Sequence, residues 1–227
     1  MTLPLSQPRA NECSTYLPWE KIEHSNRRIK NMKRLVFISF TLLAFTATMF
    51  AGDIVGKVKV QRAKNNANVV VYIDKIEGKV FEPPEKHAVM DQKNLVFIPH
   101  VLPVLVGTTV DFLNSDDVLH NVFSPDCPDG KFNLGTWAKG IVKSFTFKKP
   151  GVSTLLCNVH PEMEAFVVAV RTPYFAVSDE EGNYTIKDVP AGKYTLMVWH
   201  EKRKAKPQVV EVPEKGTVTV NFELKRK

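Results

Sequence analysis

Cysteine is scarce in this chain, and the scarcity excludes a disulfide-stapled scaffold. The 227 residues contain three cysteines, Cys13, Cys127 and Cys157. Small secreted domains that depend on disulfides use cysteine far more densely. Cys13 lies in the N-terminal region, so Cys127 and Cys157 are the thiols of the remaining chain. We therefore expect at least one of these two thiols to have a chemical role.

Positive charge is also in short supply once the N-terminal region is set aside. The formal net charge is +7. Residues 1–51 contain seven Lys or Arg and three Asp or Glu, which gives +4 and leaves +3 for the other residues. So small an excess does not form the basic surface that a nucleic-acid-binding protein needs. We therefore expect no nucleic-acid partner.

The apolar run over residues 35–50 is shorter than a typical membrane span. It has sixteen residues, whereas a spanning helix needs about 20. A basic run over residues 26–34 precedes it and small residues follow it, an order typical of a secretory signal. This predicts a signal sequence over residues 1–51, with Met32 as an alternative start, in a periplasmic or otherwise exported protein. An uncleaved signal would instead anchor the chain to the membrane.

No amphipathic helical pattern is present after Gly52. Alternating or β-branched runs such as residues 54–60 and 67–73 recur between turn residues. Short strands at this spacing are typical of antiparallel sandwiches and barrels. We therefore expect an all-β protein. The basic run over residues 201–206 falls between two expected strands, and we interpret it as a solvated hairpin tip.

Three potential metal ligands lie within one short segment. Cys157, His160 and Met163 occur in C-N-V-H-P-E-M, between two strand-like runs. A blue copper site needs two imidazoles, one thiolate and a weak axial thioether. One turn could supply three of these groups, and His120, in an upstream strand-like stretch, is the candidate for the second imidazole. Each residue alone would usually be a packed side chain, so the prediction depends on the whole set.

The segments around these residues resemble the cupredoxins. The resemblance rests on T-V-D-F-L-N at 109–114, H-N-V at 120–122 and F-K-K-P-G-V-S-T-L-L-C at 147–157. The steps from cysteine to histidine to methionine resemble the short ligand loop of amicyanin. Over residues 93–171, this implies a Greek-key β-sandwich with one mononuclear type 1 copper. The implied ligands are His120, Cys157, His160 and Met163.

The same resemblance implies a supporting residue and leaves one ligand position open. Asn121 would hydrogen-bond across the site and hold the Cys157 loop in place. At the axial position, Glu162 and Glu164 flank Met163, and either carboxylate could replace the thioether. We favour Met163 because its step from His160 matches amicyanin.

Cys127 has no place in this ligand set. It lies in the polar segment S-P-D-C-P-D-G, after the stretch that contains His120. We interpret it as a partly exposed free thiol. The alternatives are an additional metal ligand and a disulfide partner for Cys157 in copper-free protein.

The cupredoxin resemblance implies an electron carrier rather than an enzyme. Its partners would be redox proteins such as a c-type cytochrome or a periplasmic dehydrogenase. Multicopper oxidases and nitrite reductases connect a blue site to a catalytic copper through histidines beside the cysteine. Here the neighbours of Cys157 are Leu156 and Asn158, so we expect no enzymatic activity. The alternative is copper storage or delivery, or a binding module without redox turnover.

The C-terminal region resembles the carboxypeptidase regulatory-like domain, a small transthyretin-like sandwich. The resemblance rests on G-N-Y-T-I-K-D-V-P-A-G-K-Y-T-L at 182–196. Such domains open with two strands that this region lacks, whereas residues 54–58 and 67–72 match them. We therefore hypothesise that the cupredoxin is inserted within this sandwich. The alternative is that the early strands belong to the cupredoxin. The expected segments are 52–76 for these early strands, 77–171 for the cupredoxin and 172–227 for the regulatory-like sandwich.

Overall fold

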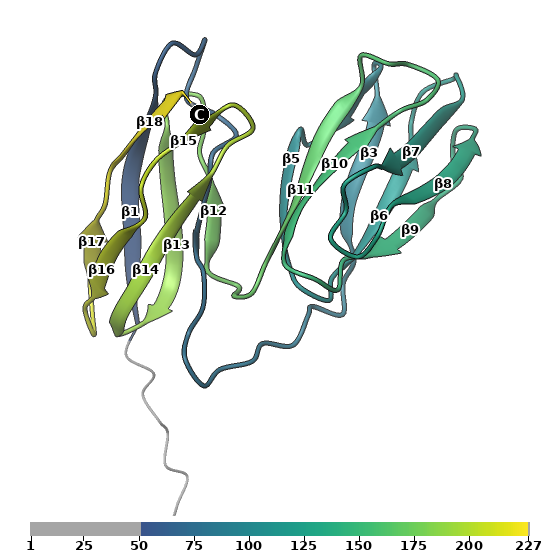
Figure 1. The fold of residues 1–227 in the computed structure, drawn as a ribbon. Coiled ribbons are helices and arrows are strands. Elements are labelled where there is room, and N and C mark those ends of the chain that lie inside the picture. Colours follow the sequence, from purple (N-terminus) through teal and green to yellow (C-terminus); the bar gives the residue numbers. More distant parts are fainter. Residues whose placement is uncertain (1–50, 227) are drawn as a thin grey trace, which may run out of the picture. The chain divides into compact units, whose positions relative to one another are not determined.

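The computed structural model describes residues 51–226, and its regular elements there are all strands. The expected signal sequence therefore lies outside the described residues, except for Ala51, which is the first residue of β1. No helix in the described range is long and apolar enough to cross a membrane. The strands form four sheets, arranged as two β-sandwiches (Figure 1).

The first sandwich, called here the host sandwich, combines strands from both ends of the described range. One sheet has the order β13-β1-β18-β15, with β17 also paired to β1, and the other has the order β12-β2-β14-β16. The strand bounds are β1 Ala51–Val60, β2 Val70–Ile73, β12 Phe175–Val177, β13 Asn183–Pro190, β14 Gly192–Trp199, β15 Arg203–Lys204, β16 Gln208–Val212, β17 Thr217–Thr219 and β18 Phe222–Arg226.

The second sandwich, called here the inserted sandwich, is built from the strands in between. Its sheets have the orders β5-β11-β10-β7-β8 and β4-β3-β6-β9. The strand bounds are β3 Ala88–Lys93, β4 Val96–Ile98, β5 Val101–Leu105, β6 Thr109–Asn114, β7 His120–Ser124, β8 Phe132–Trp137, β9 Lys143–Thr146, β10 Gly151–Leu156 and β11 Glu164–Val170.

Backbone pairing decides where the early strands belong. β1 runs antiparallel to β13, from Ala51 opposite Pro190 to Lys57 opposite Asn183, and its last residues run parallel to β18. β2 lies between β12 and β14. Both early strands are thus in the host sandwich, as the insertion hypothesis requires, and neither pairs with a strand of the inserted sandwich.

Each sandwich has its own apolar core. The host core contains Ile54, Val58, Ile186, Leu196 and Leu224, drawn from β1, β13, β14 and β18. The core of the inserted sandwich includes Phe112, Val122, Leu155 and Val167, together with Cys157 and Met163. Alternate residues of each strand point to one face, so the period-two pattern of β6 and β13 places their apolar side chains inward.

The motif that indicated a regulatory-like domain has a physical basis in close backbone contacts. The Tyr184 hydroxyl donates to the Val220 carbonyl at 2.6 Å. Gly182 has φ +88°, and a Cβ at this position would lie 2.1 Å from the Val58 carbonyl oxygen. The Tyr194 hydroxyl donates to the Pro190 carbonyl at 2.9 Å, which closes the turn between β13 and β14. The glycine and the tyrosines are therefore needed to join the strands of the host sandwich.

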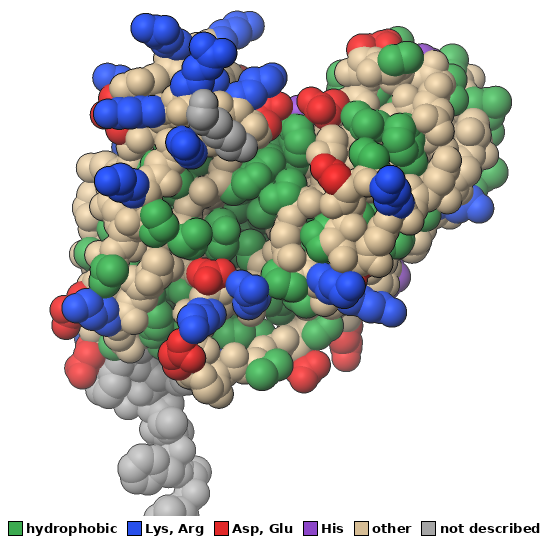
Figure 2. Space-filling view, in the orientation of Figure 1, with side chains coloured by type: hydrophobic (Ala, Val, Ile, Leu, Met, Phe, Trp, Pro, Cys, Tyr) green, Lys and Arg blue, Asp and Glu red, His purple; other side chains and the backbone are tan. Residues whose placement is uncertain are grey.

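The expected solvated hairpin tip contains a short strand, β15. Arg203 and Lys204 lie directly opposite Arg226 and Lys225 of β18. Figure 2 shows Lys and Arg side chains gathered at this end of the host sandwich. Like charges directly opposite each other oppose strand pairing, which fits the length of only two residues. Sequence periodicity gave no indication of this strand.

We predict that Gly56→Ala strongly destabilises the host sandwich. A Cβ on Gly56 would lie 1.7 Å from the Val220 carbonyl oxygen and 2.8 Å from the Tyr184 ring. Backbone cannot move aside as a flexible side chain can, so we expect a loss of about 3 kcal/mol in the free energy of unfolding. Urea denaturation monitored by tryptophan fluorescence measures this loss.

Gly78→Ala is the matched control. Gly78 has φ +72°, and nothing lies within 4 Å of the position that an added methyl group would occupy. We therefore expect only the backbone cost of about 1 kcal/mol. Equal denaturation midpoints for the two variants would contradict the proposed clash.

Candidate metal centre

Strand pairing brings together ligands that are far apart in the sequence. His120 is the first residue of β7, and Cys157 immediately follows β10. β7 and β10 are antiparallel neighbours, with Phe123 opposite Leu156. This pairing places the start of β7 beside the end of β10, so His120 lies next to Cys157. His160 follows in the loop between β10 and β11.

The three candidate ligand atoms form a compact triangle. His120 Nδ1 and His160 Nδ1 are 3.1 Å apart, and each lies 4.0 Å from Cys157 Sγ. A triangle with these sides has a point about 2.2 Å from all three corners, which matches metal–nitrogen and metal–sulfur bonds to a first-row ion. Two imidazoles and one thiolate can therefore coordinate a single ion here without a change of backbone.

The ligand chemistry and burial fit copper. His120 and Cys157 are buried, and His160 is half-buried. In the described part of the chain, no other group of three His, Cys, Asp or Glu side chains is arranged to hold a metal. The set contains a soft thiolate and no carboxylate, which suits copper and disfavours magnesium or calcium. The residues thus fit a type 1 copper site.

The loop orients Met163 inward and its two acidic neighbours outward. Met163 is fully buried and belongs to the same core cluster as Cys157, and its amide donates to the His160 carbonyl at 3.1 Å. Glu162 and Glu164 are exposed. This pattern supports the thioether, rather than a carboxylate, as the fourth ligand.

Asn121 makes the contacts that its predicted role calls for. Its side-chain oxygen accepts a hydrogen bond from the Asn158 amide at 3.3 Å, and its backbone amide donates to Cys157 Sγ at 3.4 Å. Its Nδ2 donates to Asn133 Oδ1 at 2.8 Å and to the Gly135 carbonyl at 2.6 Å. Asn121 therefore connects the cysteine loop to β8, and its backbone amide stabilises negative charge on the sulfur.

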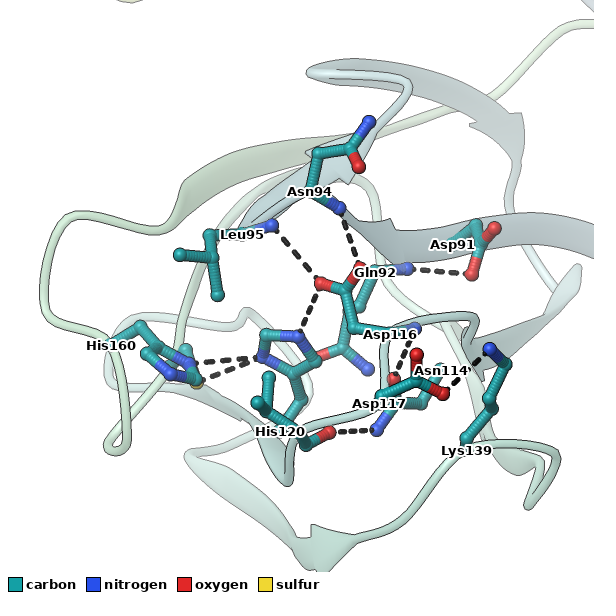
Figure 3. Close-up of polar contacts among 12 residues, drawn as sticks. Asp91, Gln92, Asn94, Leu95, Asn114, Asp116, Asp117, His120, Lys139 and His160 are labelled. Carbon is teal, nitrogen blue, oxygen red and sulfur yellow. Dashed lines mark hydrogen bonds and ion pairs between the residues drawn. The ribbon is translucent and has the colours of Figure 1, made fainter.

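Asp116 is a residue of the site that the sequence did not indicate. Its Oδ2 lies 2.8 Å from His120 Nε2, on the side of the ring opposite the ligand atom Nδ1 (Figure 3). The carboxylate also accepts the amide hydrogens of Asn94 at 2.7 Å and Leu95 at 3.0 Å. Burial alone would raise the pKa of the Asp116 carboxyl, but the hydrogen bonds from Leu95, His120 and Asn94 outweigh it and lower this pKa to about 2.

An ionised Asp116 fixes the proton arrangement of His120. A carboxylate only accepts hydrogen bonds, so Nε2 of His120 must carry the proton and Nδ1 keeps its lone pair. Carboxylate–histidine–metal arrangements of this kind orient the ring and raise its basicity as a ligand. The spacing of four residues between Asp116 and His120 was visible in the sequence, but the loop that joins them gave no periodic signal.

Cys127 lies outside the ligand triangle. Its thiol is free and buried, with 6% exposure, and it packs in the core of the inserted sandwich. The interpretation as a partly exposed thiol is therefore wrong about exposure. The segment that contains it folds back onto β10, where Asp126 accepts hydrogen bonds from the backbone and hydroxyl of Thr154. Cys157 is also free, so the two thiols do not form a disulfide.

Comparisons with known proteins matched parts of the chain. Residues 161–225 match the family model of the carboxypeptidase regulatory-like domain. The match begins within the loop before β11 and runs into β18, so it includes β11 of the inserted sandwich and does not include β1 and β2 of the host sandwich. A search of curated proteins found no relative.

Several solved structures are similar to part of the chain. A purple cupredoxin from Nitrosopumilus maritimus is 27% identical, with 36% of this chain and 98% of that chain covered and a TM-score of 0.33. An oxidised amicyanin mutant is 27% identical, with 39% and 86% covered and a TM-score of 0.36. A copper-containing nitrite reductase from Thermus scotoductus SA-01 is 26% identical, with 44% of this chain covered and a TM-score of 0.37. The match spans only 25% of the reductase chain.

Residues 161–225 match the model of the carboxypeptidase regulatory-like domain, and a part of the chain is similar to solved cupredoxin structures. The cluster of His120, Cys157, His160 and Met163 lies in the inserted sandwich.

We predict that Met163→Leu raises the reduction potential of the copper-loaded protein. The thioether is a weak axial donor, and its loss removes electron density that favours Cu(II). The substitution keeps the volume of a fully buried side chain, so the fold should change little. Cyclic voltammetry measures the shift.

Glu162→Gln, at an exposed neighbouring position, is the control and should leave the potential unchanged. An unchanged potential and spectrum for Met163→Leu would rule out the axial role.

Proposed function

We propose that this protein is an exported carrier of single electrons that uses one type 1 copper. The observation that carries the proposal is the buried triangle of His120, Cys157 and His160, with Met163 packed in the same core. Copper bound there would supply a one-electron Cu(II)/Cu(I) couple. The protein residues hold the ligand atoms, exclude water from the thiolate and limit rearrangement between the two states.

The surroundings of the ligands favour little movement during such a cycle. His120 is held by Asp116 on one side, and the Cys157 loop is held by Asn121. β7, which carries His120 and Asn121, and β10, which Cys157 follows, are neighbours in one hydrogen-bonded sheet. Donors to the cysteine sulfur, such as the Asn121 amide at 3.4 Å, also tune the potential of a copper–thiolate centre.

His160 is the most accessible of the three ligands and offers an exit for the electron. Apolar residues next to His160 in the sequence and just before β7 are exposed, with Val159 at 43% and Leu119 at 53%. Pro161 is also exposed. Exposed apolar side chains beside a half-buried ligand suit a transient redox partner, such as a c-type cytochrome or a periplasmic dehydrogenase.

The neighbours of the cysteine argue against a copper enzyme. Leu156 and Asn158 flank Cys157, so no histidine connects this centre to a second copper through the adjacent residues. The described residues offer no second group of metal ligands to hold one. Copper storage or delivery is the alternative function, since the same ligands would also retain Cu(I).

In this proposal the N-terminal region determines whether the protein is exported and whether it is anchored to a membrane. The basic and apolar runs of residues 26–50 would direct the chain out of the cytoplasm. Membrane association would occur only where that segment is uncleaved. Mass spectrometry of the mature protein from its host identifies the N-terminus, and a mature chain that still contains the apolar run of residues 35–50 would contradict cleavage.

We predict that the purified protein binds one Cu(II) with an intense visible thiolate charge-transfer band and shows reversible voltammetry. Cys157→Ser should abolish the band because it removes the thiolate. Cys127→Ala is the matched control and should retain it, because Cys127 lies outside the ligand triangle. Absorption during copper titration measures both variants. A colourless protein that binds only Cu(I) would refute the carrier and support delivery.

A further inference from the structure

A two-residue turn outside the ligand set is joined to the metal centre through Asp116. β3 and β4 form a hairpin in which Lys93 pairs with Val96, so Asn94 and Leu95 are its entire loop. Both have positive φ, 56° and 60°, as a type I′ turn requires. Asparagine is common in such a turn, but the second position usually holds glycine. A leucine there is a backbone outlier next to the site.

The carboxylate of Asp116 stabilises this turn. The amides of Asn94 and Leu95 both donate to it, at 2.7 and 3.0 Å (Figure 3). Successive backbone N–H groups that converge in this way form a concave anion site. Asp116 is placed in turn by its own amide, which donates to Asn114 Oδ1 at 2.9 Å. The turn and the carboxylate therefore hold each other in one arrangement.

The remaining hydrogen bond of this carboxylate goes to the candidate metal ligand. Oδ2 of Asp116 accepts from both the Leu95 amide and His120 Nε2. Three N–H donors thus share two oxygens. The orientation of the carboxylate toward His120 depends on the two amide donors of the turn, those of Asn94 and Leu95. A side chain held by a single bond could rotate away, whereas this one is held from two directions.

We propose that Asp116 is a positioning residue for His120 and that the Asn94–Leu95 turn is the element that aims it. The inference rests on the proposed copper site. It assigns a role in ligand orientation to Leu95, a residue outside the ligand set, and this role needs only its backbone amide. The leucine side chain itself is 40% exposed and is not needed for this role.

The neighbouring aspartate provides a matched control. Asp117 is exposed and pairs with Lys139 at 2.8 Å. Asp116→Asn leaves one acceptor oxygen for three donors, and its new NH₂ group can donate to Nε2 of His120. The proton of His120 would then move to Nδ1, the atom that must bind the metal. Asp117→Asn has the same change of charge without this effect.

The test measures the His120 tautomer by ¹⁵N NMR in metal-free protein and the copper affinity by competition with a chelator. In the parent protein we expect the Nε2–H form. Asp116→Asn should populate the Nδ1–H form and weaken copper binding about 10- to 100-fold. Asp117→Asn should leave the tautomer unchanged and alter the affinity by less than about twofold, because exposed ion pairs contribute little.

A second pair of variants tests the turn. Leu95→Gly keeps the amide donor and suits positive φ, so the Nε2–H form and the affinity should be retained. Leu95→Pro removes the donor and cannot adopt positive φ, so the carboxylate should lose its orientation toward His120 and the population of the Nε2–H form should fall. Amide dispersion in the same spectra shows whether each variant is folded.

The outcomes separate this inference from the proposed function. Failure of the parent protein to bind copper would refute the proposed function, while the tautomer in metal-free protein would still test the positioning role. Copper binding by the parent with equal tautomer and affinity in Asp116→Asn and Asp117→Asn would overturn the role of Asp116. An unchanged tautomer in folded Leu95→Pro would overturn the role of the turn.

Discussion

The pairing of β1 with β13 and β18 is the constraint on which the architecture depends. It joins Ala51 to Pro190 and Val58 to Phe222, residues more than a hundred positions apart. The sheet of the host sandwich cannot form without this long-range pairing, because β1 lies between β13 and β18 rather than at an edge. The chain must therefore leave the host sandwich and return to it at neighbouring points. At these points the Thr172 hydroxyl donates to the Ile73 carbonyl at 2.7 Å.

Within the inserted sandwich, the pairing of β7 with β10 also brings together residues that are far apart in the sequence. Phe123 opposite Leu156 aligns β7 with β10, and this register sets His120 beside Cys157. A shift of one residue would turn every side chain of the strand to the other face. The register of the sheet therefore determines the distance between His120 and Cys157, and the sequence of the loop then determines where His160 lies. The hydrogen bonds of Asn121 then fix the loop to that register.

The sequence was informative where a residue's role depends on its type and spacing. Cys157, His160 and Met163 occupy one loop, and His120 begins a strand with recognisable neighbours, so the ligand set could be predicted. The all-β class followed from alternation, and the early strands were matched to the host sandwich by their resemblance to the opening strands of regulatory-like domains. The glycine and tyrosines of the regulatory-like motif were recognisable because close backbone contacts restrict those positions to few residue types.

The sequence was less informative where a role depends on three-dimensional contacts alone. Asp116 is one of two adjacent aspartates, and only the folded hairpin distinguishes it from Asp117. Residues 94–98 (N-L-V-F-I) have the apolar character of a strand, yet Asn94 and Leu95 form a turn with positive φ and only Val96–Ile98 is a strand. β8 interrupts its alternation with Gly135 and was not anticipated. Cys127 follows polar turn residues but is buried, because Asp126 draws its segment onto β10.

The discontinuous host sandwich has a consequence for how such a chain can be rearranged. A module joined to its host at one end can be removed by a single truncation. The inserted sandwich, in contrast, is connected to the host sandwich at both of its ends. Any cut on one side of the inserted sandwich separates β1 and β2 from their partners and deprives the host of its central strand. Conversely, a different module whose termini lie close together could replace residues 74–171 without altering the host's pairing. The host sandwich therefore determines where a module can be inserted, and the inserted sandwich with its candidate metal centre is the part that could be exchanged.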